Sequence, residues 1–268
     1  MKYSVLLLFV FLFSCGSIKI KELQSDYTQP LTGNIKSINA TIYEYRIVEN
    51  DTTVWTKNHL MEFDTDNLLI KETKINEDET TEFNYKYMNG LVTEMTSPQD
   101  KNNYKTIYTY DEKKNCIEEK ALNNDKTFHS VTKVFDEFNN PIEENRVFFG
   151  KMNHKTKNTY NYKEKTISSE KFMDTLFTGT IKTKMTFNKK GYITRKETLI
   201  QKSSNNFDQY QFDTAGNLLQ KTTHYSDRTI KETFSYQNTY DKKGNIIARK
   251  KFYNGKLVGK TTFDITYW

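Results

Sequence analysis

The chain is short of the residues that build many other folds. Of its 268 residues, two are cysteines, three are prolines and ten are glycines, and only 35% are hydrophobic. So little proline and glycine excludes collagen-like and proline-rich chains, and so few aliphatic residues exclude a thick two-layer α/β core. Aromatic residues are plentiful, with 18 tyrosines and 18 phenylalanines, whereas disordered chains are poor in them. The composition predicts an ordered chain that buries a thin aromatic surface.

The longest apolar run lies at the N-terminus. Lys2 precedes nine apolar residues at 5–13, and as a helix this run would rise about 13 Å, less than half of a bilayer core. A run of this length after a basic residue is typical of a secretory signal. The run ends in Leu12-Phe13-Ser14-Cys15, which resembles the lipobox of bacterial lipoproteins.

The lipobox resemblance implies that the Cys15 sulfur receives a diacylglyceryl group, that the chain is cut before Cys15, and that the new N-terminus is acylated. We expect a signal peptide at 1–14, a lipidated tether at 15–30 and a folded domain at 31–268. Loss of Lys2 lowers the formal charge from +6 to +5. The alternative is ordinary secretory cleavage with Cys15 incidental.

The residues after Cys15 bear on where such a lipoprotein would lie. Gly16 and Ser17 follow it, not the Asp that retains lipoproteins in the inner membrane, so the resemblance implies the outer membrane. No acidic run follows, so we expect the chain to face the periplasm and not the cell surface. With Cys15 acylated, Cys116 remains as a single thiol, which excludes an internal disulfide and predicts a buried small hydrophobic residue.

A repeat of about 25 residues runs through the rest of the chain. Each copy has an aromatic residue, then Asp or Asn, then Gly or Asn, then an aliphatic residue. The clearest copies are EFDTDNLLIKET at 62–73, YDEKKNCIEEKA at 110–121, FDEFNNPIEENR at 135–146, FNKKGYITRKET at 187–198, FDTAGNLLQKTT at 212–223 and YDKKGNIIARKK at 240–251. Weaker copies lie at 86–95, 160–171 and 252–263.

The repeat predicts a β-hairpin with a capped turn. An Asp side chain accepts hydrogen bonds from backbone N–H groups of its own turn. The predicted caps are Asp64, Asp111, Asp136, Asp213 and Asp241. A residue with positive φ is expected at Gly191, Gly216 and Gly244, with Asn115 or Asn140 in the same role. The pairs Asn89-Gly90 and Asn254-Gly255 predict tighter type I′ turns.

Alternation along the chain favours strands. Thr81, Phe83, Tyr85 and Tyr87 share one face, and polar residues lie between them. We therefore predict an all-β domain of consecutive antiparallel hairpins that forms one strongly curled sheet or an irregular barrel, with the first strands at 31–58.

The F/Y-D-x-x-G-N-L pattern, clearest in FDTAGNLL at 212–219, resembles the YD repeat of Rhs-type proteins over roughly 60–268. The resemblance implies stacked hairpins in a long curling sheet. The segment at 31–50 resembles the stretch before such repeats in small bacterial lipoproteins, for which no activity is known as a class. The chain has about eight or nine hairpins, too few to enclose a folded cargo.

Patterns that carry catalysis or metal binding are missing. The four histidines are scattered, and the DTDN stretch at 64–67 lacks the glycine and distal glutamate of a calcium loop. Glu118-Glu119 and Glu143-Glu144 point to opposite faces of their strands, so neither pair can act together in acid–base chemistry. We predict no enzyme activity, no cofactor and no metal. Acids interleave with the lysines, so nucleic acid is not expected as a partner.

A transmembrane barrel is also disfavoured. The alternate residues before the aromatic C-terminus, Trp268, are Thr266, Asp264 and Thr262, where such barrels place apolar residues.

The sequence thus predicts a non-enzymatic, outer-membrane-anchored lipoprotein whose sheet is a binding or structural surface. The partners expected are the membrane, through the lipid, and an envelope protein or glycan. Tyr108, Tyr210 and Tyr236 are candidates for stacking on sugars, with core packing as the alternative. An immunity factor against a secreted toxin and an envelope polysaccharide hydrolase are the other hypotheses.

Overall fold

A computed structural model describes residues 19–21, 29, 31–48, 51–77, 79–98, 103–173, 179–199 and 206–268. The predicted signal peptide, Cys15 and most of the predicted tether lie outside the described residues. Within these ranges the structure contains no helix long and apolar enough to cross a membrane.

The described chain is built from β-strands that follow one another in sequence. Their bounds are β1 (Ile35–Val48), β2 (Asp51–Phe63), β3 (Leu69–Ile75), β4 (Thr80–Met88), β5 (Leu91–Thr96), β6 (Lys105–Tyr110), β7 (Cys116–Asn123), β8 (Lys126–Phe135), β9 (Pro141–Phe148), β10 (Lys151–Asn161), β11 (Thr166–Met173), β12 (Gly179–Phe187), β13 (Ile193–Leu199), β14 (Phe207–Phe212), β15 (Leu218–His224), β16 (Ile230–Tyr240), β17 (Ile246–Tyr253) and β18 (Lys256–Tyr267).

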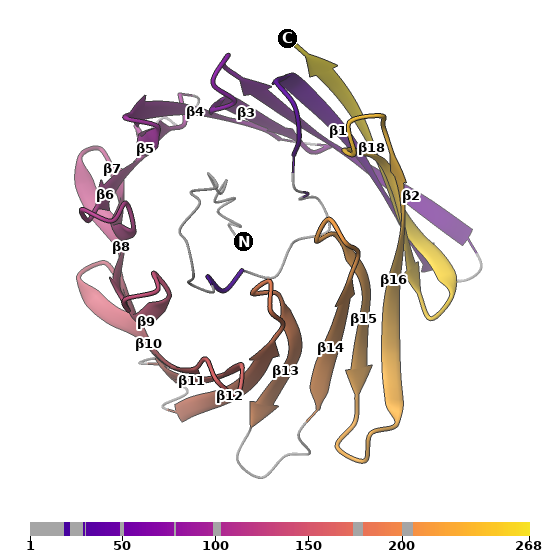
Figure 1. The fold of residues 1–268 in the computed structure, drawn as a ribbon. Helices are drawn as coiled ribbons and strands as arrows, with labels where there is room; N and C mark the ends of the chain where they lie inside the picture. Colours follow the sequence, from indigo (N-terminus) through magenta and orange to yellow (C-terminus); the bar gives the residue numbers. More distant parts are fainter. Residues whose placement is uncertain are drawn as a thin grey trace.

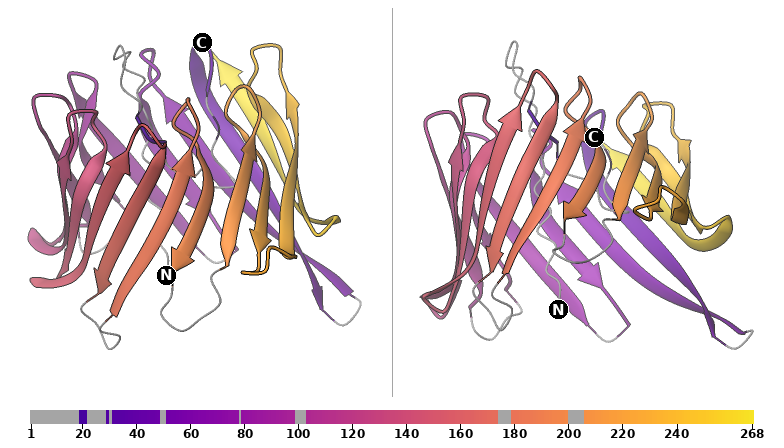
Figure 2. Two further views of the ribbon diagram at one scale, coloured as in Figure 1. Left: turned by 60° about the horizontal axis from the view of Figure 1, so that its bottom comes forward. Right: turned by 90° about the horizontal axis from the view of Figure 1, so that it is seen from below.

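The sheet closes into an 18-stranded antiparallel barrel (Figure 1). Each strand pairs with its neighbours in sequence, and β1 pairs with both β2 and β18, so no strand is left at an edge. Figure 2 shows the strands inclined to the barrel axis, with the hairpin turns gathered at its two ends. The prediction of an all-β fold of consecutive hairpins is confirmed, and its curled sheet is a closed barrel.

One end of the barrel, here called the Asp-turn mouth, carries the capped turns. It is formed by the turns at 64–68, 89–90, 111–115, 136–140, 162–165, 188–192, 213–217 and 241–245. The opposite mouth includes the described turns at 124–125, 149–150, 225–229 and 254–255.

The cap of these turns has the predicted geometry. Asp241 Oδ1 accepts the backbone N–H groups of Lys243 and Asn245 at 2.8 and 2.9 Å. The Gly244 N–H donates to the Asp241 carbonyl at 3.1 Å, and Gly244 has φ of 87°. The same arrangement recurs at Asp64, Asp111, Asp136 and Asp213, and with Asn188 in the Asp position.

One detail of the predicted turn is wrong. The positive φ in the turns without glycine falls on Lys114 (64°) and Asn139 (61°), and not on Asn115 and Asn140. Asn115 lies one position later, where its amide returns to Asp111 Oδ2 at 2.9 Å. At the fifth turn position the backbone already enters the next strand, so positive φ is not needed there. The asparagine side chain at this position instead forms a buried hydrogen bond.

The aromatic residue of each of the six clearest copies begins a β-bulge. Between Glu62 and Phe63 the register shifts, so that Phe63 lies opposite Leu69 across the turn. Equivalent pairs are Tyr110–Cys116, Phe135–Pro141, Phe187–Ile193, Phe212–Leu218 and Tyr240–Ile246. Many of these side chains are buried, and Phe63, Leu69 and Ile246 belong to the main core cluster. The repeat thus encodes an apolar belt just inside the Asp-turn mouth.

The apolar face of the sheet points into the barrel. Residues 19–21 lie inside the ring of strands (Figure 1), and Lys21 Nζ lies 3.0 Å from the hydroxyl of Tyr192, on the aromatic face. Leu31 packs against the same core cluster.

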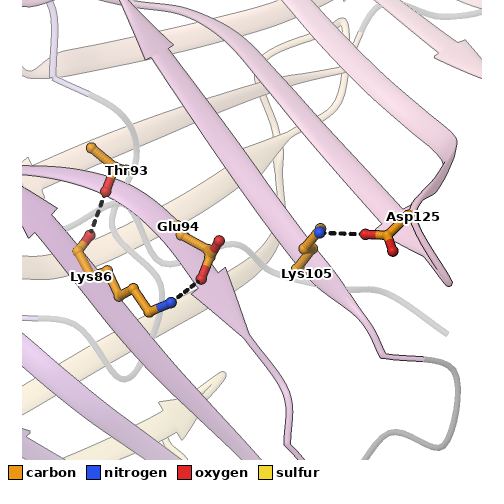
Figure 3. A network of polar contacts seen from close by, with 5 residues as sticks. All are labelled: Lys86, Thr93, Glu94, Lys105 and Asp125. Carbon is orange, nitrogen blue, oxygen red and sulfur yellow. Dashed lines mark hydrogen bonds and ion pairs between the residues drawn. The ribbon is translucent and has the colours of Figure 1, made fainter.

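The outer face carries charges and hydroxyl groups. Ion pairs on it join adjacent strands, including Lys86 Nζ to Glu94 Oε1 at 2.6 Å and a pair between Lys105 and Asp125 (Figure 3). Thr262, Asp264 and Thr266 lie on this face of β18, opposite Thr41, Asn39 and Ser37 of β1.

The two tight turns Asn89-Gly90 and Asn254-Gly255 have positive φ at both residues, as type I′ turns require. The pairs Asn124-Asp125 and Phe149-Gly150 adopt the same positive φ values without having been predicted.

We predict that Asn245→Ala destabilises the barrel by about 2–4 kcal/mol. Asn245 is fully buried, and its amide donates to Tyr267 Oη at 2.7 Å and to the Thr32 carbonyl at 2.8 Å. Urea unfolding measures the loss, with Asn39→Ala on the exposed outer face as the control and an expected change within about 0.5 kcal/mol. Equal losses in both variants would contradict this role.

Candidate functional site

The inner wall contains a pocket of about 380 Å³ around Gly259, on β18. Gly259 lies between Lys251 of β17 and Glu44 of β1 in the register. Because glycine has no side chain, this position leaves a gap in an inner wall otherwise covered by side chains. An added Cβ would lie 3.1 Å from the Tyr43 carbonyl oxygen, so even alanine would be tight there.

Aromatic rings form one side of the pocket. Phe234 and Tyr253 line it, with ring centres 5.1 Å apart and planes tilted by 47°. Tyr236, two residues further along β16, also lines it. Side chains two residues apart on one strand share a face, so these rings make a continuous aromatic surface.

Cationic side chains lie beside the rings. Lys251 Nζ is 5.0 Å from the Phe234 ring centre, and the Arg249 guanidinium is 5.8 Å from that of Tyr236. Arg249 is 3% exposed, and its Nε donates to Asn238 Oδ1 at 3.0 Å, which holds it in place. The carboxylate lining the pocket is Glu44, which forms an ion pair with Lys57 at 3.2 Å. The lining combines flat apolar rings with cations, a surface suited to a ring-shaped ligand that carries an anionic group.

The three tyrosines predicted to stack on sugars do not form one site. Tyr210 and Tyr236 are buried and pack with Leu218 in one cluster. Tyr108 is half-buried on β6, in another part of the wall. Only Tyr236 lines the Gly259 pocket. The other pocket residues were missed because they come from strands far apart in the sequence, although the glycine within an alternating strand at 259 marks a gap.

A buried charged network lies on the inner wall of β2, β3 and β4. His59 Nε2 is 2.5 Å from Glu72 Oε1, the Tyr85 hydroxyl donates to Glu72 Oε2 at 2.7 Å, and Lys74 Nζ is 3.1 Å from Oε1. Glu72 is 1% exposed. Burial opposes its ionisation, but the His59 contact and the Lys74 charge outweigh burial and hold the pKa of Glu72 at about 2.

The Glu72 network lacks the features of a general acid–base site. A carboxyl group that acts as a general acid near neutral pH has a raised pKa, and the pKa of Glu72 is lowered instead. Both of its oxygens are engaged by neighbouring side chains. The network therefore joins three strands of the inner wall, and hairpin register alone could have located it, because Met61 lies opposite Glu72 and His59 opposite Lys74.

Two carboxylates, Asp241 and Asp264, line a depression of about 500 Å³ near β18. Asp241 is the turn cap described above, and the Tyr267 hydroxyl donates to its Oδ2. That hydrogen bond lowers the pKa of Asp241. A cap held in this way favours a structural role over hydrolysis.

The histidines and Cys116 are separate from the pocket. Among the described residues, no cluster of three or more His, Cys, Asp or Glu side chains could hold a metal. His129 stacks on Phe148 with ring centres 4.2 Å apart. Cys116 is half-buried, and burial raises the pKa of its thiol to about 11, so it is a weak nucleophile at neutral pH.

We predict that the barrel loses stability in acid through Glu72. Since the pKa of Glu72 falls from 4.5 to about 2 on folding, its contribution is present above about pH 4.5 and is lost as the pH falls toward 2. The expected loss is roughly 3 kcal/mol. Urea unfolding between pH 2 and 7 measures it.

Glu72→Gln should flatten that pH dependence and destabilise the barrel at pH 7. Glu82→Gln is the control, because Glu82 pairs with Lys71 at 2.7 Å on the outer face, where such a pair contributes about 1 kcal/mol or less. A Glu72→Gln barrel with the pH dependence of the natural protein would contradict this assignment.

No protein-family model matches the chain, and a comparison with curated proteins finds no match. Solved structures that are similar to it include two porin-like proteins. A porin-like protein from Bacteroides uniformis ATCC 8492 is 10% identical, with a TM-score of 0.47 and coverage of 87% of this chain and 96% of the other. A porin-like protein from Bacteroides vulgatus ATCC 8482 is 13% identical, with a TM-score of 0.38 and coverage of 88% and 99%.

Proposed function

We propose that the protein is a non-enzymatic binding protein of the cell envelope, held at the outer membrane by a lipid on Cys15 and facing the periplasm. The barrel stands in water, and the Gly259 pocket binds an acidic carbohydrate. The observation that carries the proposal is the pocket itself, where aromatic rings and cations meet in a gap of the inner wall.

The outer wall supports a barrel in water. Lys71 pairs with Glu82, Lys120 with Glu118, and Lys182 with Glu170, all on the outer face. Charged side chains at bilayer depth cost about 2–4 kcal/mol each. A wall with repeated ion pairs is therefore better suited to the aqueous side of a membrane than to its interior.

The pocket chemistry supports a carbohydrate with a carboxylate. The apolar face of a sugar ring can pack on Phe234 or Tyr253, and its hydroxyls can reach polar groups of the wall. Arg249, Lys251 and Lys260 line the pocket with three positive charges against the single carboxylate of Glu44. This balance favours an anionic ring over a neutral one.

The carboxylates described above support a role without catalysis. Glu72 and Asp241 both have a lowered pKa and both are held by hydrogen bonds. Neither carries the raised pKa that a hydrolase needs in its general acid.

Lys251→Glu should abolish binding of oligosaccharides of galacturonic or glucuronic acid, because it reverses a charge in the pocket. Lys250→Glu is the matched control, since Lys250 lies next to it in β17 and faces outward. Isothermal titration calorimetry against these oligosaccharides and neutral ones of the same length measures the difference. Equal binding by both variants, or no binding by the natural protein, would overturn the proposed ligand.

Cys15→Ala should abolish incorporation of labelled palmitate and release the protein from outer-membrane fractions. Cys116→Ala is the control and should keep both properties, because its thiol lies within the barrel wall. Palmitate labelling of cells that express each variant tests the anchor. Unchanged labelling of Cys15→Ala would show that this cysteine is not the lipidation site.

A further inference from the structure

The described N-terminal residues are bound at the Asp-turn mouth of the barrel. Lys21 N–H donates to the Gly191 carbonyl at 2.9 Å, and Ile20 N–H donates to Asn140 Oδ1 at 2.7 Å. The Lys21 ammonium lies 4.1 Å from the Tyr192 ring centre. A Cβ at Gly191 would lie 2.1 Å from the Lys19 carbonyl oxygen, so this glycine allows the close approach.

A second attachment follows a few residues later at the same mouth. Gln29 Nε2 donates to the Ile246 carbonyl at 2.9 Å, and Thr32 N–H donates to Asn245 Oδ1 at 2.7 Å. The start of the described chain is thus held by three capped turns, 136–140, 188–192 and 241–245, before β1 begins.

The distance from these contacts to Cys15 is limited by chain length. Cys15 lies four residues before Lys19, and four extended residues span at most about 14 Å. This step rests on the proposed lipid anchor. If acyl chains on Cys15 lie in the bilayer, then the short segment between Cys15 and Lys19 brings the Asp-turn mouth to the membrane surface.

The charges around this mouth are uneven. One side of the mouth, with the turns at 161–165, 188–192, 213–217 and 241–245, contains Lys163, Lys165, Lys189, Lys190, Lys242 and Lys243 against Glu164, Asp213 and Asp241. The other side has the turns at 64–68, 111–115 and 136–140, the last of which also binds Ile20 through Asn140. It contains Lys113 and Lys114 against Asp64, Asp66, Asp111, Glu112, Asp136 and Glu137. Anionic lipid headgroups attract the first side and repel the second.

We propose that the Asp-turn mouth docks on an anionic lipid surface, with its lysine-rich side, formed by the turns from 161 to 245, closest to the headgroups. The opposite mouth then points away from the membrane. The Gly259 pocket lies toward that opposite mouth, since β18 begins at Lys256 after the turn at 254–255. Ligand therefore reaches the inner wall from the side away from the bilayer.

Fluorescent labels on single cysteines test the orientation. In a Cys116→Ala background, Lys189→Cys labels the lysine-rich side, Lys113→Cys the acidic side of the same mouth, and Lys256→Cys the opposite mouth; all three lysines are exposed. The full-length lipidated protein is placed in vesicles of phosphatidylethanolamine and phosphatidylglycerol with an acceptor dye on the headgroups.

Energy transfer should be strongest from position 189, weaker from 113, and weakest from 256, whose label should lie about 20 Å farther from the headgroups because the strands span that height. Changing Lys190, Lys242 and Lys243 to Glu should reduce transfer from 189 to that from 113 or below. Equal or stronger transfer from 256 would overturn the orientation.

Palmitate labelling of the same samples separates the two proposals. Labelled protein with the reversed order of transfer overturns the docking surface and leaves the anchor intact. Protein without palmitate overturns both. If the lysine-to-glutamate change leaves the order of transfer intact, then the tether alone sets the orientation, and the lysine-rich side is not a lipid-binding surface.

Discussion

The capped turn is the interaction on which the rest of the barrel depends. Its Asp carboxylate accepts hydrogen bonds from backbone N–H groups of the turn. The closed turn places the preceding aromatic residue opposite the following aliphatic residue, as in Phe63 and Leu69. A slip of one residue would turn every side chain of the hairpin to the other wall. The turn therefore decides which residues face the inside of the barrel, and its repetition builds the apolar belt at one mouth.

Closure explains how so few aliphatic residues suffice. The pairing of β1 with β18 removes both edges of the sheet, so no strand needs a covering layer. An 18-stranded barrel is wide, and its inner side chains do not all meet across it. Beyond the apolar belt the inner wall can therefore carry charges, as Glu72 and Arg249 do, provided that each finds hydrogen-bonding partners within the wall.

The two mouths have different chemistry because the repeat is directional. Caps, buried asparagines and the bound N-terminal residues all lie at the Asp-turn mouth, where Asn140 and Asn245 accept backbone N–H groups of residues 20 and 32. The side-chain amide of Asn115 instead donates to Asp111, the cap of its own turn. Asparagines of the repeat thus stabilise turns and also bind the N-terminal residues, which links the fold to the proposed attachment at the membrane.

The sequence by itself determined the hairpins, the capped turns and the two faces of each strand, because turn geometry and the two-residue period are local. Asp241 and Asn254-Gly255 could be assigned without a structure for this reason. Closure and the Gly259 pocket were decided only by the tertiary structure. Glu44 meets Gly259 because the first and last strands pair, and nothing local to either residue specifies that contact.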